Sequence, residues 1–168
     1  MSRAPQSDNA FWRFSLAVYG AEGVAGECLE LQARYGIDVN LLLFVVWLGA
    51  ARRRAVSPSD LERARRRVGH WHDTAVRPLR SVRMALKSAN EAGAQDLRAQ
   101  VKSLELDAER IEQSALYEFA SVVWPDPGAD DPRVAVQDNL TTFLSSHGVS
   151  GASTLAPRLI EAAFRHSS

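Results

Sequence analysis

The hydrophobic pattern of the chain centres on one stretch, between Asn40 and Arg52, that contains no charged side chain. Its leucines, phenylalanine, valines and tryptophan cover every side of a helix, whereas a surface helix carries one apolar stripe. Such a helix must be enclosed by others, so we predict that residues 38–52 form the central helix of a bundle. Asp38 is suited to cap its first turn, and Gly36 is suited to end the preceding helix in the left-handed conformation.

Shorter amphipathic segments surround this stretch. Ser7 or Asp8 is a suitable N-cap for a first, aromatic-rich helix, and a second helix is expected at about 24–35. Residues 121–132 are rich in proline, glycine and acids and predict a loop. Further helices are expected to begin at Asp131-Pro132 and at Ser153. Because no strand pattern occurs, we predict an all-α fold and one domain spanning residues 1–168.

Two matching seams occupy the middle of the chain. Ser57-Pro58-Ser59-Asp60 is a helix start, after which apolar or small residues recur at steps of three and four as far as Ala89. The same spacing returns over 97–119, after a glycine-containing turn at 90–95. This pattern predicts a long antiparallel helical hairpin over about 58–120. Pro78 interrupts the first seam and cannot donate a backbone hydrogen bond, so we expect a kink there.

Several short motifs resemble a family of small proteobacterial proteins of unknown function. They are Phe11-Trp-x-Phe-Ser15, Cys28-Leu-x-Leu-Gln32, Gly36-x-Asp-Val-Asn-Leu-Leu-Leu-Phe44 with Trp47, then Trp71 and Pro78-Leu-Arg80. The resemblance covers about the first half of the chain well. It implies a bacterial, cytoplasmic setting and carries over no activity, cofactor or site residue.

A net charge of zero conceals an uneven distribution. Residues 52–87 contain eleven arginines and lysines against three acids, and the rest of the chain is correspondingly acidic. On the expected hairpin these cations would form a basic helical face able to bind phosphates or an acidic protein. The members of this predicted face are Arg63, Arg66, Arg67, Arg77, Arg80, Arg83 and Lys87.

Internal neutralisation is the alternative, and we favour it because charge patterns usually serve a solvated helix face. An antiparallel hairpin would place the basic residues alongside the acids of the returning helix. Those acids are Glu105, Asp107, Glu109, Glu112 and Glu118. Nucleic-acid binding is disfavoured, since the chain as a whole is not basic and shows no interleaved stacking aromatics.

The remaining features favour a cytoplasmic protein. Cys28 is the only cysteine, so no intramolecular disulfide can form, which suits a reducing compartment. Residues 1–9 lack the layout of a signal peptide. The longest apolar run, residues 41–51, falls short of the roughly 20 residues that a membrane span requires.

Polar residues beside the central helix form a second candidate site. Gln32, Asp38 and Asn40, together with Trp71 and His72, could line a small ligand pocket, although we favour helix capping and inter-helix hydrogen bonds as the role of such residues. His70 and His72 are two residues apart and would point to different sides of a helix, unlike the histidines of helical zinc motifs. We therefore expect no metal site and no cofactor.

The sequence contains no catalytic motif, and we favour a non-catalytic function over an enzyme. If the basic helical face is not neutralised internally, the function we expect is an adaptor or regulator that binds an anionic protein partner through this face. The alternative is a small-molecule-binding protein or enzyme with a pocket beside the central helix. The aromatic surplus of the first helix leaves a homo-oligomer open.

Overall fold

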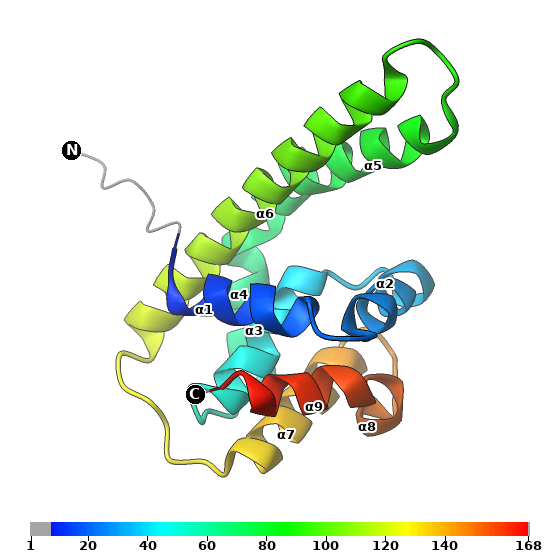
Figure 1. Ribbon diagram of the computed structural model, residues 1–168. Coiled ribbons are helices and arrows are strands. Elements are labelled where there is room, and N and C mark those ends of the chain that lie inside the picture. Colours follow the sequence, from blue (N-terminus) through cyan, green and yellow to red (C-terminus); the bar gives the residue numbers. More distant parts are fainter. Residues whose placement is uncertain (1–7, 168) are drawn as a thin grey trace, which may run out of the picture.

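The computed structural model describes residues 8–167, and for residues 152 and 153 the backbone alone. This part of the chain is helical and contains no strand, which confirms the all-α class (Figure 1). The helices are α1 (Ala10–Tyr19), α2 (Val24–Tyr35), α3 (Val39–Ala50), α4 (Pro58–Trp71), the π-helix η1 (His72–Val76), α5 (Arg77–Ala85), the 3₁₀ turn η2 (Leu86–Ser88), α6 (Ala94–Val123), α7 (Pro132–Ser145), α8 (Ala152–Leu155) and α9 (Pro157–Arg165). None of the described helices is both long and apolar enough to cross a membrane.

Helix α3 is the buried centre of the bundle, as its composition predicts. Every residue from Asn40 to Ala50 is buried. Oδ1 of Asp38 accepts from the backbone N–H groups of Asn40 at 2.8 Å and Leu41 at 3.4 Å, so Asp38 is the N-cap. Gly36 has a φ of 65° and ends α2 in the left-handed conformation. The predicted corner between α2 and α3 is confirmed.

Aromatic side chains join α3 to the helices beside it. The ring of Phe11 on α1 lies 5.5 Å from that of Phe44 and 5.3 Å from that of Trp47. The ring of Tyr117 on α6 lies 5.9 Å from that of Trp47. The predicted cap of α1 is wrong for Asp8, because Oδ1 of Asn9 accepts from the N–H of Trp12 instead. The other candidate cap, residue 7, lies outside the described residues.

Helix α7 crosses α3 so closely that a glycine is required. A Cβ atom added to Gly49 would lie 2.6 Å from the backbone nitrogen of Val136, closer than non-bonded atoms approach. The buried amide of Asn139 then fixes the chain after α3. Its oxygen accepts from the N–H of Val56, and its nitrogen donates to the carbonyls of Val45 and Arg54.

The predicted hairpin consists of α4, η1, α5 and α6 (Figure 1). Helix α4 packs on the core through Leu61, Ala64 and Val68, and its cap at Ser57 is as predicted. We call the projecting part, formed by α5, η2 and the N-terminal half of α6, the arm. Since a helix rises about 1.5 Å per residue, the 30 residues of α6 span about 45 Å and belong to both arm and bundle.

The helical interruption precedes Pro78 rather than falling on it. In η1 the N–H of Arg77 donates to the carbonyl of His72, five residues earlier, where an α-helix would use the fourth. The extra residue explains why two steps of four follow each other in the apolar seam, from Trp71 to Ala75 and from Ala75 to Leu79. Pro78 then lies in the first turn of α5, and because η1 runs directly into α5, its missing N–H leaves a carbonyl of the preceding turn without its usual helical donor.

The C-terminal helix differs from its prediction. A single helix was expected from Ser153, but α8 and α9 are separated at Ala156, which has φ −138° and ψ 49°. Pro157 explains the break, because the residue before a proline avoids the helical conformation. The carboxylate of Glu27 on α2 caps α9 by accepting from the N–H groups of Arg158 and Leu159, each at 3.0 Å.

The close crossing of α3 and α7 yields a stability prediction. Gly49→Ala should lower the free energy of unfolding by about 1–3 kcal/mol, because the added methyl overlaps the α7 backbone. Gly26→Ala is the matched control. It also lies within a helix but has open space around it, so it should stabilise by about 0.5–1 kcal/mol. Urea unfolding of both variants measures the difference, and equal stabilities would contradict the crossing.

Candidate functional site

An enclosed polar cluster lies where the start of α3, the start of η1 and the middle of α6 meet. Nδ1 of His72 is 3.3 Å from Oδ2 of Asp38 and 3.3 Å from Oε2 of Glu112. Nδ2 of Asn40 donates to the same Oε2 atom of Glu112 at 3.1 Å. Nε2 of Gln113 in turn donates to Oδ1 of Asn40 at 2.8 Å. Residues far apart in the sequence are thereby joined in one network, which we call the polar cluster.

Solvent scarcely reaches the polar cluster. The side chain of Glu112 has no exposed surface, and those of Asp38 and His72 are 15% and 14% exposed. Oε1 of Glu112 is buried and has no hydrogen-bond partner among the described residues. A buried polar atom without a partner carries a desolvation cost of about 1–3 kcal/mol, so this oxygen is a feature that requires an explanation.

Burial and neighbouring charge also shift protonation in the polar cluster. Burial raises the pKa of Asp38 well above its usual range, and the nearby charge of Glu112 raises it further, against the opposing effect of His72. For His72, burial alone would lower the pKa. The hydrogen bond to Glu112 and the charges of Asp38 and Glu112 outweigh burial and leave the pKa raised.

A second network of ion pairs lies further along the hairpin. Arg80 is 3.0 Å from Oε1 of Glu105 and 2.7 Å from Oε1 of Glu109, and its third nitrogen donates to Oε1 of Gln32 at 2.8 Å. Arg83 forms a two-point contact with the carboxylate of Glu105. These pairs join α5 to α6 and, through Gln32, to α2. Burial alone would raise the pKa of Glu105, but hydrogen bonds from Arg83 and Arg80 outweigh it and lower the pKa.

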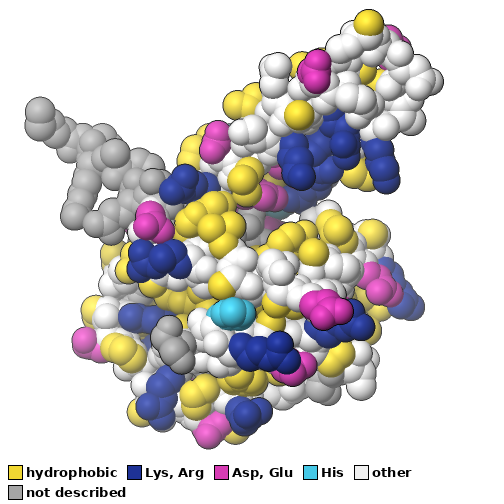
Figure 2. Space-filling model, viewed as in Figure 1, with side chains coloured by type: hydrophobic (Ala, Val, Ile, Leu, Met, Phe, Trp, Pro, Cys, Tyr) yellow, Lys and Arg dark blue, Asp and Glu magenta, His cyan; other side chains and the backbone are white. Residues whose placement is uncertain are grey.

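The predicted basic face is only partly an open surface. Figure 2 shows Lys and Arg side chains gathered on the flank of the arm that faces the rest of the molecule. However, the side chains of Arg80 and Arg83 are only 18% and 19% exposed, because both are turned toward the acids of α6. For these two arginines the structure shows the internal neutralisation that we favoured from the sequence. The other predicted members are exposed. Four of them form ion pairs, which are Arg63 with Asp60, Arg66 with Glu62, Arg67 with Glu118 and Arg77 with Asp73. The fifth is Lys87.

The candidate pocket residues divide between different places. Asp38, Asn40 and His72 do come together, within the polar cluster. Gln32 instead contacts Arg80, and Nε1 of Trp71 donates to the carbonyl of Ala108 at 2.9 Å. Trp71 also lines a separate surface pocket of about 290 Å³, which we call the Trp71 pocket. Its lining residues are Arg67, Val68, Trp71, Ile111, Glu112, Ser114, Ala115 and Glu118.

Sequence reasoning missed Glu112 and Gln113 as members of the polar cluster. Glu112 was interpreted as one of several acids facing the arginines. A signal was present, because Glu105 and Glu112 are seven residues apart and so occupy the same side of α6. Both are buried. Which glutamate faces the arginines and which faces the histidine depends on how η1 and α5 align with α6. The sequence pattern does not specify this alignment.

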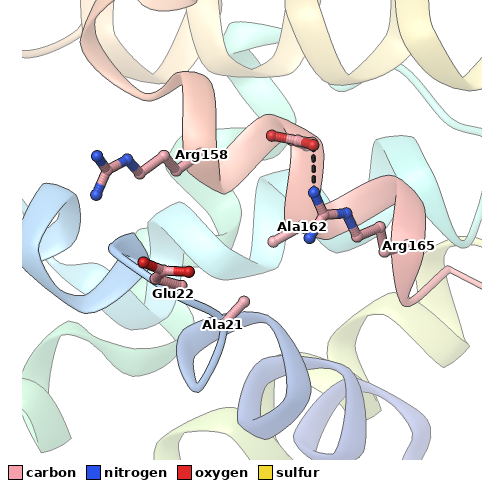
Figure 3. A pocket seen from close by; sticks show the side chains of 6 residues that line it. Ala21, Glu22, Arg158, Ala162 and Arg165 are labelled. Atoms are coloured by element: carbon pink, nitrogen blue, oxygen red, sulfur yellow. Dashed lines mark hydrogen bonds and ion pairs between the residues drawn. The ribbon is translucent and has the colours of Figure 1, made fainter.

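Another pocket, of about 280 Å³, lies between α9 and the turn after α1. Figure 3 shows Arg158 and Glu22 on its two sides, with Arg165 paired to Glu161 along α9. These charged side chains are exposed on the surface. The pocket is therefore a shallow depression between solvated charges, and we assign it no ligand.

The hydrogen-bonded core of the polar cluster falls within the part of the chain that has recognisable relatives. A family model described as "protein of unknown function (DUF2390)" matches residues 10–116. The chain belongs to this family. The match confirms the expected membership of an uncharacterised family, and it contains Asp38, His72 and Glu112 but ends before α7. No curated protein and no solved structure matches the chain.

The Glu105 network yields a prediction with a defined pH dependence. Glu105→Gln should lower the free energy of unfolding at pH 7 by about 2 kcal/mol, because the partly buried Arg83 loses its carboxylate partner and Arg80 keeps only Glu109. Since the pKa of Glu105 is lowered on folding, its contribution is present above the ordinary value of 4.5 and is lost as the pH falls through the folded value. The wild-type advantage in urea unfolding should therefore shrink below pH 4.5.

Glu118→Gln is the matched control for this measurement. Glu118 also pairs with an arginine across the hairpin, Arg67, but the side chains of both residues are more than half exposed. Such a pair contributes at most about 1 kcal/mol. Equal losses in the two variants would contradict the assigned role of Glu105.

Proposed function

We propose that the protein is a non-catalytic adaptor or regulator that binds an amphipathic helix of a protein partner along α6. The observation that carries the proposal is an apolar row on this helix. Leu97, Leu104 and Ile111 are 50%, 54% and 44% exposed and are spaced seven residues apart. Seven residues make about two helical turns, so the three side chains lie on one face. We call this row the α6 stripe.

The α6 stripe ends at a pocket that suits a large apolar side chain. Ile111, its last member, lines the Trp71 pocket together with Trp71 and Val68. Trp71 is itself 37% exposed. Helices that dock on a helical surface use apolar anchors at regular spacing, one of which typically fills a pocket. The partner is expected to present such an anchor opposite Trp71.

The exposed arginines of α4 supply the charge selectivity of the proposed surface. Arg67 lines the Trp71 pocket, and the side chains of Arg63 and Arg66 on the same helix are 48% and 65% exposed. Arg66 and Arg67 pair with the exposed acids Glu62 and Glu118, and exposed pairs contribute little to stability. These arginines can therefore exchange partners at low cost, which favours a partner helix with acidic residues beside its apolar face. Such charges mainly raise the association rate and select the partner.

The setting of the protein is part of the same proposal. We infer one domain over residues 1–168, because α6 carries the arm and also contributes Leu116 and Ala120 to the core around α3. The buried free thiol of Cys28 and the resemblance described above support the cytoplasm of a proteobacterium.

The proposal is tested by placing charge on the α6 stripe. In crosslinking and affinity capture, the double variant Leu97→Glu/Leu104→Glu should lose a protein that the wild type retains, because burying a carboxylate against an apolar partner is unfavourable. Val122→Glu is the matched control, since Val122 is on the same helix, is 82% exposed and lies outside the stripe. It should capture the protein as the wild type does.

The captured protein is then purified and titrated against each variant, and circular dichroism establishes that the variants remain folded. Binding should weaken as salt is added, if the arginines of α4 contribute. Equal affinity of the wild type and the double variant would refute the proposal. Light scattering that shows a dimer dependent on Leu97 and Leu104 would instead identify the partner as a second copy of the chain.

A further inference from the structure

Three potential metal ligands converge in the polar cluster from separate elements. They are Oδ2 of Asp38, which caps α3, Nδ1 of His72 at the start of η1, and Oε2 of Glu112 on α6. One donor atom from each lies within 4.8 Å of the other two. All three residues are held on helices or at a helix cap, so the donors are placed by rigid structure.

Hydrogen bonding explains this arrangement incompletely. A ring nitrogen of histidine carries at most one hydrogen, so Nδ1 of His72 can donate to one carboxylate but not fully to two. Both of its distances, 3.3 Å, exceed the usual 2.7–3.2 Å range of an N–H···O hydrogen bond. By contrast, tetrahedral ligands at about 2.0–2.1 Å from a Zn²⁺ ion lie about 3.3 Å from one another. The two distances therefore match two edges of a coordination tetrahedron.

The charge of the cluster favours a divalent cation. Asp38 and Glu112 are two carboxylates in an enclosed site, and their ion pairs among the described residues are with His72. The nearest basic network does not compensate for them, because Arg80 is already shared by Glu105 and Glu109. Buried carboxylates are costly unless a cation or a metal balances them. One divalent ion would neutralise both.

An unused ligand atom points to the same conclusion. Oε1 of Glu112 is buried and without a hydrogen-bond partner among the described residues, although the side chain has no exposed surface at all. An ion bound between the three residues would give this oxygen a partner, either directly or through a bound water.

Neighbouring residues orient the donors as outer-shell residues do in metal sites. The two cap hydrogen bonds from Asn40 and Leu41 go to Oδ1 of Asp38, which leaves Oδ2 directed at His72. Asn40 also donates through its side chain to Glu112, and Gln113 fixes Asn40. Outer-shell hydrogen bonds of this kind hold metal ligands in place.

We propose that Asp38, His72 and Glu112 bind one divalent first-row transition-metal ion, with Zn²⁺ as the best fit. Mixed imidazole and carboxylate donors suit Zn²⁺, and three protein ligands with an open fourth position are typical of it. The ion joins the beginning of α3 to η1 and α6, and so fixes the base of the arm on the bundle. The expectation of no metal site considered only histidines on one helix, whereas these donors come from three elements. The inference does not rest on the proposed partner helix, although Glu112 also lines the Trp71 pocket.

The test uses the full chain without a histidine tag, stripped of metal with a chelator. Isothermal titration with Zn²⁺ should show one ion bound per chain, and the bound ion should raise Tm, since it binds the folded state alone. Glu112→Gln and Asp38→Asn should each weaken binding at least tenfold. Asp38→Asn keeps an N-cap residue, so this variant removes the ligand charge while preserving the start of α3.

His70→Ala is the matched control. His70 is two residues from His72 but lies outside the cluster, and this variant should bind Zn²⁺ as tightly as the wild type. X-ray absorption at the zinc edge of the wild type, which requires no variant to fold, should show imidazole and oxygen ligands and no sulfur. The proposal is overturned if the wild type binds no stoichiometric Zn²⁺, if sulfur from Cys28 is a ligand, or if the folded Glu112 and Asp38 variants bind Zn²⁺ as the wild type does.

Discussion

The structure depends on the enclosure of α3. Its residues from Asn40 to Ala50 are all buried, so no side of this helix can face water without a large hydrophobic cost. Helices α1, α6, α7 and α9 all contact it. The tightest contact is with α7, where Gly49 allows the two backbones to meet. The packing of the other helices is thus dictated by one segment that cannot form a surface.

This dependence explains which parts of the fold could be predicted from the sequence. The uncharged run over 41–51, the capping signals at Asp38 and Ser57, and the two apolar seams are local patterns, and each formed the predicted element. The departures arise where two local signals compete. Asn9 rather than Asp8 caps α1, a difference of one residue between two neighbouring side chains that could both serve as caps. Pro157 divides the last helix, because the residue before a proline avoids the helical conformation.

The candidate site was less predictable because it depends on how helices align. Asp38, Asn40 and His72 could be selected as polar residues near an apolar helix, but Glu112 is 40 residues from His72 and its role depends on the angular position of both. The π-helix η1 changes the angular position of Arg80 and Arg83, since one extra residue in a turn rotates every side chain that follows. Periodicity alone cannot specify how the following residues meet α6. The division of α6 acids between Arg80 and His72 is therefore a tertiary property.

The need to enclose α3 also accounts for the place of the polar cluster. The first turn of any helix has backbone N–H groups that require acceptors, and when the helix is buried its cap must be largely buried too. Asp38 therefore brings a carboxylate to the edge of the core, where its second oxygen needs a partner of its own. His72 supplies that partner only in part, because it is shared with Glu112. A cation at this point would satisfy the cap, the histidine and the orphaned oxygen of Glu112 together, which no single hydrogen bond within the described network does.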